Sequence, residues 1–410
     1  MAGWKLADKE IKTKNMLKKY LLLILKHKIL KVIYATVLLF IALEVIARLV
    51  WGVKSTKLFN ETVPDMVLHH KARPNMEVVD NGRSIPYTLR TNSQSWVEDY
   101  DVTKEKPAET YRIFYVGDSN TVGLIDSYKK MAEIVEAELN KIYKPKGMRI
   151  EVINTGSVSY SPLLYFLLIK TRIMEYNPDL VVINVDMTDA SNDAVYRKSA
   201  VNDSQGVPIA VRPNFDADSK YYLMTPQGSV KISKFAYFRM QLHQFLVSHS
   251  VLFYQFETFV NKLFKGKLPT FLPHAMNYVS EDRTANWVAQ TWTSEIEDNV
   301  AYSMKILEYA ISLLKSNKVK VYITGVPHYP QFTGAWSTRP HEVLGTTAAK
   351  YSVPYLNTYE EMKKYTETTG TDASAFYWKE DGTHLNSEGN ALWAKIQLEF
   401  LLNKKNELLP

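Results

Sequence analysis

The sequence predicts an α/β protein with a mostly parallel five-stranded sheet, an N-terminal transmembrane helix and a helical insertion. Three observations lead to this fold class. From Tyr111 onward, short apolar runs alternate with amphipathic runs. The short runs are apolar throughout, as is typical of parallel strands covered by helices on both faces. A separate apolar stretch near the N-terminus is long enough to cross a bilayer.

The composition excludes several classes of protein. The chain has 410 residues, of which 46% are hydrophobic, with only 16 Gly and 17 Pro. It can therefore bury a sizeable core, and disordered or collagen-like chains are excluded. There is no cysteine, which excludes disulfides, thiolate metal sites and a cysteine nucleophile.

Positive charge is confined to the N-terminus. Of the 50 basic and 43 acidic residues, ten basic and three acidic ones lie in residues 1–51, which leaves 40 of each in the remainder. Nucleic-acid binding requires a basic surface that neutralises phosphates. The neutral remainder therefore indicates no nucleic-acid partner.

Residues 29–51 are predicted to form the transmembrane helix. The only charged residues at positions 29–50 are Lys31, Glu44 and Arg48, and 22 residues span about 30 Å at roughly 1.5 Å per residue. Nine lysines lie at or before Lys31, so the positive-inside rule places the basic segment 1–28 in the cytoplasm and the remainder outside. A cleaved signal peptide and an in-plane amphipathic helix are the alternatives.

The outer part begins with a stalk and irregular lead-in at 52–109, because turn formers and charges dominate there. The main domain then covers 110–410. Its expected strands are 111–116, 149–153, 180–185, 319–324 and 354–356. Its expected helices are about 127–143, 161–176, 299–316, 340–351 and 386–402, the last with Asn386 as N-cap.

The segment at about 197–298 interrupts the alternation of strands and helices, so we interpret it as an insertion. It has a loop rich in Gly, Pro and Asp to about 228, and then an aromatic-rich helical region at 235–264. We expect a helical cap on the main domain. The alternative is that its aromatic side chains line a substrate groove or contact the membrane surface.

The residues that follow the predicted strands carry the chemistry, because ligands of open parallel sheets bind beyond the carboxyl ends of the strands. Gly-Asp-Ser-Asn at 117–120 follows the first strand and Asn-Thr-Gly at 154–156 follows the second. A polar loop at 186–193 follows the third, and Asp381 and His384 precede the last helix. A Gly-Asp-Ser string alone arises by chance in on the order of one chain in ten of this length. The joint pattern is far more specific and predicts a site at one edge of the sheet.

These blocks resemble the SGNH (GDSL-type) hydrolase superfamily, in particular its bacterial members with an N-terminal membrane anchor. The resemblance covers most of residues 90–402. It is carried by 112–123 (RIFYVGDSNTVG), 154–160, 178–193, Val326-Pro327 and 381–389 (DGTHLNSEG), with a lead-in at 92–95. It implies a three-layer, flavodoxin-like SGNH fold and a serine hydrolase.

The resemblance implies that Ser119 is the nucleophile, His384 its base and Asp381 the group that orients the imidazole. The residue types fit, since a serine hydroxyl needs a base and histidine titrates near neutrality. The implied oxyanion hole consists of the Ser119 and Gly156 amides and an Asn side chain. The family's Gly-x-Asn-Asp block is not present in clean form, so Asn192 is the favoured Asn donor and Thr188 the alternative.

No metal or cofactor is expected. The histidine spacings fit no common zinc motif, and no Gly-x-Gly-x-x-Gly or P-loop string occurs. The remaining histidine pairs are the stalk residues His69 and His70, and His243 with His249 at a spacing that does not share one helical face.

The sequence thus predicts an extracytoplasmic serine esterase that hydrolyses an ester, such as an O-acetyl group, on an envelope or secreted glycan. One alternative is a glycan O-acyltransferase that passes the acyl group to a sugar hydroxyl. Another is a non-catalytic carbohydrate-binding or assembly protein on the same fold.

Overall fold

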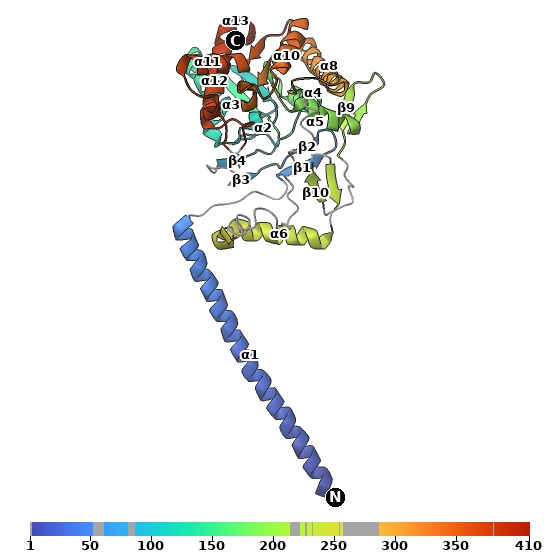
Figure 1. Cartoon of the computed structure of the whole chain (residues 1–410), viewed down its shortest axis with the longest axis vertical. Helices are drawn as coiled ribbons and strands as arrows, with labels where there is room; N and C mark the ends of the chain where they lie inside the picture. The colour runs from blue at the N-terminus through green and yellow to red at the C-terminus, as the bar shows by residue number, and fades with distance from the viewer. Residues whose placement is uncertain are drawn as a thin grey trace. The chain divides into compact units, whose positions relative to one another are not determined.

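The computed structural model describes residues 2–51, 61–80, 87–213, 222–225, 228–231, 233–253, 255–256, 287–379 and 381–410 (Figure 1). The chain divides into two compact units. The first comprises Met1–Lys54 and Phe245–Pro269, and the second comprises Ser55–Gln244 and Thr270–Pro410.

The second unit is organised around a five-stranded parallel sheet, as predicted. Its strands are β5 (Thr110–Val116), β6 (Arg149–Asn154), β7 (Leu180–Asp186), β12 (Lys320–Val326) and β13 (Tyr355–Asn357). Their order across the sheet is β13-β12-β7-β5-β6, and every pairing is parallel. Counted along the chain, this is the 2-1-3-4-5 order of flavodoxin-like folds, with a switch point between β5 and β7.

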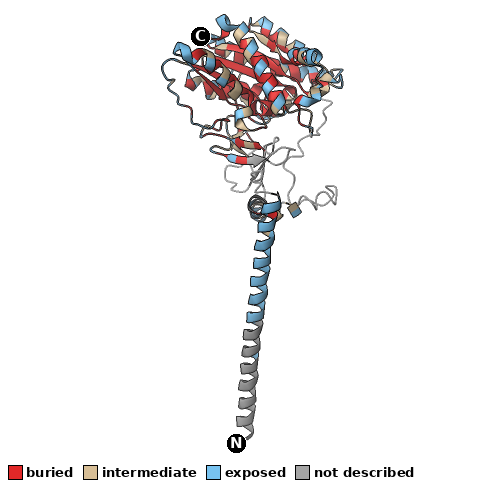
Figure 2. Cartoon of the chain, turned by 90° about the vertical axis from the view of Figure 1, so that its left-hand side faces the viewer, coloured by how far each residue is buried: buried red, intermediate tan, exposed pale blue. Residues whose placement is uncertain are grey.

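Helices cover both faces of this sheet, which makes a three-layer α/β fold. Successive residues of β5 point to opposite sides, so Phe114 and Val116 enter one core while Ile113 and Tyr115 enter the other. The first core is completed by α4 (Pro162–Thr171), α5 (Asp189–Tyr196), α8 (Ser294–Ser316) and α10 (Arg339–Lys350). The second is completed by α3 (Met131–Tyr143), α11 (Thr358–Thr369) and α12 (Ser387–Asn403). Figure 2 shows the buried residues concentrated in these layers.

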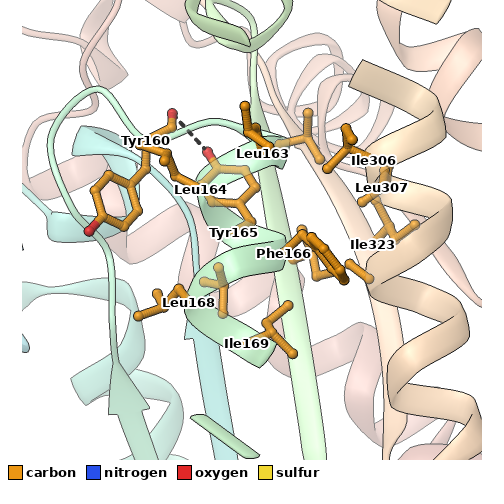
Figure 3. Close-up of a cluster of buried hydrophobic side chains, with 14 of the residues drawn as sticks. Tyr160, Leu163, Leu164, Tyr165, Phe166, Leu168, Ile169, Ile306, Leu307 and Ile323 are labelled. Atoms are coloured by element: carbon orange, nitrogen blue, oxygen red, sulfur yellow. Dashed lines mark hydrogen bonds between the residues drawn. The ribbon is translucent and has the colours of Figure 1, made fainter. Parts of the chain in front are cut away.

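Helix α4 is apolar all round, which explains its burial between sheet and helices. Leu163, Phe166 and Ile169 pack in the core that also holds Ile306 and Leu307 of α8, and Figure 3 shows these side chains together. The Tyr165 hydroxyl lies within hydrogen-bond distance of the backbone oxygen of Tyr160, at 3.4 Å, and of Asp189 Oδ1, at 3.3 Å, so this buried polar atom is satisfied. Short helices complete the unit: α2 (Ser119–Val122), α9 (Tyr329–Phe332) and α13 (Lys405–Leu408).

The expected strands are all confirmed, and the expected helices are confirmed with shifted ends. The helix α8 begins at Ser294 because the Thr293 hydroxyl caps it by accepting from the Ile296 amide at 3.3 Å. The Asn386 cap of α12 is confirmed, since its side chain accepts from the Gly389 amide at 2.9 Å. The helix α11 was not predicted. It is mostly polar, with only Thr358, Tyr359 and Met362 buried, so its apolar periodicity is faint.

The lead-in is more ordered than the sequence suggested. Instead of an irregular segment, it forms two antiparallel hairpins, β1 (Thr62–Asp65) with β2 (His69–Ala72) and β3 (Glu77–Asp80) with β4 (Tyr87–Arg90). The second packs Val78, Tyr87 and Leu89 in a small core. The two stalk histidines are in fact buried in β2 with their Nδ1 atoms 2.9 Å apart. Burial lowers the pKa of His69 to about 3 and also lowers the pKa of His70.

The insertion is also less helical than expected. It contains the hairpins β8 (Ala200–Asn202) with β9 (Pro208–Val211) and β10 (Tyr222–Thr225) with β11 (Gly228–Lys231) before the helix α6 (Lys234–His249). Two-stranded pairing of such short runs has too little periodicity to be predicted from sequence. Residues 257–264 of the expected aromatic helix lie outside the described part of the chain.

The first unit contains the long helix α1 (Ala2–Trp51). Within it, Lys26–Val50 is long and apolar enough to cross a membrane, and none of its most apolar window is buried inside the protein. A signal sequence would have the same properties.

A buried ion pair ties the lead-in to the sheet. The Arg112 side chain of β5 is fully buried, and its Nε donates to Glu151 Oε2 of β6 at 2.6 Å. Its Nη1 also donates to the backbone oxygens of Tyr176 at 2.7 Å and Thr103 at 3.0 Å. The guanidinium thus holds two loops as well as one carboxylate.

We therefore expect Arg112→Met to lower the free energy of unfolding by about 3–5 kcal/mol, because the buried Glu151 would lose its close partner and keep only the more distant Arg149, at 3.9 Å. The double variant Arg112→Met/Glu151→Met should lose less. Urea unfolding followed by circular dichroism checks this. Lys141→Met is the control, since its pair with Glu138 is exposed and should contribute below about 1 kcal/mol. A double variant as unstable as the single one would contradict this explanation.

Candidate active site

Three loops meet at the carboxyl edge of the sheet. Ser119 begins α2 directly after β5, Asp186 ends β7, and His384 lies in the loop before α12. The switch point between β5 and β7 places the first two beside each other. This is the place where an open parallel sheet leaves a crevice for a ligand.

Ser119, His384 and Asp381 are joined by hydrogen bonds. Ser119 Oγ lies 2.9 Å from His384 Nε2, and His384 Nδ1 lies 2.8 Å from Asp381 Oδ2. The Ser119 residue is 9% exposed, and the His384 and Asp381 side chains are 23% and 32% exposed. The serine oxygen is therefore within proton-transfer distance of an imidazole that a carboxylate orients and that solvent reaches.

The two oxygens of Asp381 have different tasks. Oδ2 contacts the His384 ring, whereas Oδ1 accepts from the backbone amides of His384 at 2.9 Å and Thr383 at 3.0 Å. The Thr383 hydroxyl donates to the same Oδ1 at 3.1 Å. The loop is thus folded around the carboxylate that also fixes the imidazole, which explains the close spacing of Asp381 and His384 in the sequence.

Asp118 holds the turn that presents the serine. Its Oδ1 accepts from the Asn120 amide at 2.9 Å, and its Oδ2 accepts from the Ser119 hydroxyl at 3.1 Å. Burial raises the pKa of Asp118 well above its usual value, and the nearby Asp186 raises it further. The serine hydroxyl therefore has two neighbours, which are His384 and the Asp118 carboxyl group. The surroundings of Asp118 disfavour the ionised form of this carboxyl group.

The sequence analysis missed Asn120 as the link between the loops. Its Nδ2 donates to Asp186 Oδ2 at 2.9 Å and to the backbone oxygen of Thr383 at 3.1 Å. Its Oδ1 accepts from the Leu385 amide at 3.2 Å. One side chain, adjacent to Ser119, thus binds the backbone on both sides of His384.

Asp186 and His328 were missed as well. Asp186 Oδ2 lies 2.9 Å from His328 Nε2, and both side chains are 1% exposed. Burial acts to raise the pKa of Asp186, but the charge of His328 and hydrogen bonds from His328 and Thr188 outweigh it and lower the pKa to about 2. His328 stands two residues after the end of β12, so inspection of every strand end would have found it.

Gly156, whose amide is a predicted oxyanion donor, lies in the turn that follows β6. Its amide donates to Asn154 Oδ1 at 3.0 Å, within its own turn. Glycine is needed there for another reason, since a Cβ atom would lie 2.6 Å from the backbone nitrogen of Val122 in α2. The close approach of this turn to α2 thus accounts for the residue.

Of the two candidates for the Asn position, Thr188 is the one linked to the site. Its amide and its hydroxyl both donate to Asp186 Oδ1 at 2.8 Å. Asn192 lies one turn along α5, where its backbone amide donates to the Thr188 oxygen at 3.1 Å. The structure thus brings Ser119, His384 and Asp381 together, whereas the oxyanion donors stay a prediction. The described residues contain no group of three metal-ligating side chains.

Comparisons with known proteins identify no family. No family model matches the chain, and no curated protein matches it. Solved structures give matches at low identity. A two-domain esterase active on acetylated mannans is 15% identical over 73% of this chain and 51% of its own, with a TM-score of 0.36. The chain thus spans about half the length of that esterase.

Two further solved structures match along nearly their whole length. The lipase/acylhydrolase from Enterococcus faecalis is 14% identical over 72% of this chain and 96% of its own, with a TM-score of 0.37. A catalytic mutant of Axe2, an acetylxylan esterase from Geobacillus stearothermophilus, is 11% identical over 73% and 96%, with a TM-score of 0.38.

The Asp186–His328 pair generates a pH prediction. With His328 present, Asp186 stays ionised down to a pH of about 2. In His328→Gln the interaction of the His328 ring with Asp186 is lost, so burial dominates and raises the pKa of Asp186. The carboxylate then takes up a proton at higher pH, which weakens the hydrogen bond that it accepts from Asn120. The acid limb of Ser119 labelling by a fluorophosphonate should move upward by about one pH unit or more.

His341→Gln is the matched control, because His341 is equally buried and bonds Gln331 at 3.4 Å, and its acid limb should not move. A His328→Gln profile that is uniformly lower with an unmoved midpoint would mean that the pair supports only the fold.

Proposed function

We propose that this protein is a membrane-anchored, extracytoplasmic serine esterase of SGNH type. It hydrolyses an ester, such as an O-acetyl group, on an envelope or secreted glycan through an acyl-enzyme. The observation that carries the proposal is the chain of hydrogen bonds from Ser119 through His384 to Asp381. Such a chain supplies a nucleophile, a base and an orienting carboxylate, which together suffice for acyl transfer.

In the first half-reaction, Ser119 Oγ attacks the ester carbonyl and its proton passes to His384 Nε2. Asp381 stabilises the imidazolium through Nδ1. The tetrahedral intermediate collapses, the C–O bond to the sugar breaks, and the leaving oxygen takes the proton from Nε2. The acyl group remains on Ser119.

In the second half-reaction, His384 takes a proton from water, and the resulting hydroxide attacks the acyl-Ser119 carbonyl. Collapse returns the proton to Ser119 Oγ and releases the carboxylic acid. Transfer to a sugar hydroxyl instead of water would follow the same steps, with the sugar oxygen as the attacking group. Hydrolysis and transfer therefore share Ser119 and His384 and are separated by product analysis.

The substrate class follows from location and resemblance. The apolar span Lys26–Val50 and the lysines before it support a single-pass anchor with a cytoplasmic N-terminus. The site then faces the envelope, where acylated glycans are one class of ester. The sequence blocks around Ser119 and His384 resemble those of esterases.

The test uses the full chain in detergent micelles with a fluorophosphonate probe and an acetylated oligosaccharide. Labelling of Ser119 with release of acetate supports the esterase. Labelling of Ser119 with acetyl transfer to an added sugar would show that the protein is a transferase and not an esterase. Absence of both would overturn the proposal in favour of a non-catalytic binding protein.

Ser119→Ala and His384→Ala should each remove essentially all acetate release, and the double variant should be no worse than either, because the two groups act as one unit. Asp381→Asn should lower acetate release less than either of these changes, since the imidazole keeps its basicity. Steady-state kinetics check this, with circular dichroism to confirm folding. Additive losses would show that the two residues act separately.

The oxyanion donor is tested by comparing Thr188→Val with Asn192→Ala. Thr188 lies two residues after the end of β7, and its hydroxyl, which donates to Asp186 Oδ1 in this structure, would turn to the oxyanion in the transition state. We therefore expect Thr188→Val to lower kcat by on the order of a hundredfold with KM little changed. Asn192→Ala should have a much smaller effect. The opposite ranking would identify Asn192 as the donor. If both effects are small, the oxyanion hole consists of backbone amides only.

A further inference from the structure

The helix α6 exposes a continuous apolar face. Phe235, Phe238, Leu242 and Phe245 are 74%, 62%, 45% and 57% exposed. Their spacing of three, four and three residues places them within an arc of roughly 80° at about 100° per residue. Phe256, in the helical residues that follow, is 63% exposed.

Such a face is costly in water. Each large apolar side chain left exposed forgoes about 1.5–3 kcal/mol of burial. Contiguous exposed apolar residues mark a surface that meets a partner or a membrane, whereas scattered ones do not. The face of α6 therefore has an occupant.

A contact inside the first unit identifies that occupant. Directly after α6, the Ser250 hydroxyl and the amides of Val251 and Leu252 donate to the Glu44 carboxylate at 2.8, 2.9 and 3.1 Å. Glu44 belongs to α1, and Arg48 Nε donates to it at 2.8 Å. A carboxylate within an apolar span requires such donors, because an unpaired charge there is expensive.

The position of Glu44 in the apolar span indicates how deep in the bilayer the C-terminal end of α6 lies. It lies six residues before Val50, the end of the apolar span, which corresponds to about 9 Å along the helix. The residues that follow α6 are therefore bonded to the span close to its outer end, where a bilayer changes from hydrocarbon to headgroups. Amphipathic helices lie at this level with their apolar face about 5–10 Å into the boundary.

We propose that α6 lies in the plane of the outer leaflet, with Phe235, Phe238, Leu242 and Phe245 inserted among the lipids and Glu44 fixing its C-terminal end. The partner of this face is a lipid surface. The proposal rests on the membrane anchor of the proposed function and is independent of the chemistry at Ser119.

The absence of cysteine allows a direct test. Phe238→Cys and Ala236→Cys are each labelled with a nitroxide in the full chain, reconstituted in vesicles of phosphatidylcholine and phosphatidylglycerol. Ala236 is half-buried and lies on another side of α6. Oxygen concentrates in hydrocarbon, whereas a nickel chelate stays in water. The label at 238 should relax with oxygen and lose its response to nickel, and the label at 236 should not show this pattern. Adding Glu44→Ala should restore the nickel response at 238.

Carbonate washing of the same vesicles separates the two proposals. Protein that stays in the vesicles while the label at 238 responds fully to nickel would overturn the membrane placement of α6 and leave the anchor intact. Protein released by carbonate would overturn the anchor itself. A label at 238 shielded from both reagents would overturn the lipid partner in favour of contact with a second copy. A far-ultraviolet circular dichroism spectrum equal to that of the unchanged chain shows that each variant is folded.

Discussion

The buried pair of Asp186 and His328 is the interaction on which the arrangement of the site depends. A carboxylate that is 1% exposed is stable only if donors surround it. Here the His328 ring, the amide and hydroxyl of Thr188 and the Asn120 side chain all donate to it. Asn120 in turn holds the backbone on both sides of His384. The charge pair therefore determines where the loop with the proposed base can lie, although neither member touches Ser119.

The topology of the sheet makes this network possible. Three neighbouring strands, β5, β7 and β12, end at the same edge, and a residue of the network lies at or within four residues of the end of each strand. Ser119 and Asn120 follow β5, Asp186 ends β7, and His328 follows β12. Parallel strands need long crossovers, so these residues are far apart in the chain although their side chains are within hydrogen-bond distance.

The difference between closeness in the sequence and closeness in space also decides what could be predicted from the sequence. The strands were predictable because their apolar runs are continuous, and Asp381 with His384 because they lie three positions apart in the sequence. Asp186 and His328 are 142 positions apart, and no local pattern joins them before the strand order is known. The hairpins of the lead-in were missed since strands of four residues carry little periodicity. Thr188 was ranked below Asn192 on residue type, whereas its place at the strand end links it to Asp186.

The two buried aspartates beside the serine have opposite tendencies, and this division matters for the proposed reaction. His328 and its hydrogen bonds keep Asp186 ionised, with a pKa lowered to about 2. Burial and the charge of Asp186 raise the pKa of Asp118 well above its usual value. Environments that shift the pKa values of two neighbouring carboxyl groups in opposite directions give these groups different roles. The Ser119 hydroxyl donates to Asp118 Oδ2 at 3.1 Å, and His384 Nε2 lies 2.9 Å from the same oxygen of Ser119. Asp118 also accepts from the Asn120 amide, so it holds the turn that presents the serine. His384 is oriented by Asp381 and reached by solvent, which makes the imidazole the proposed base for the serine proton.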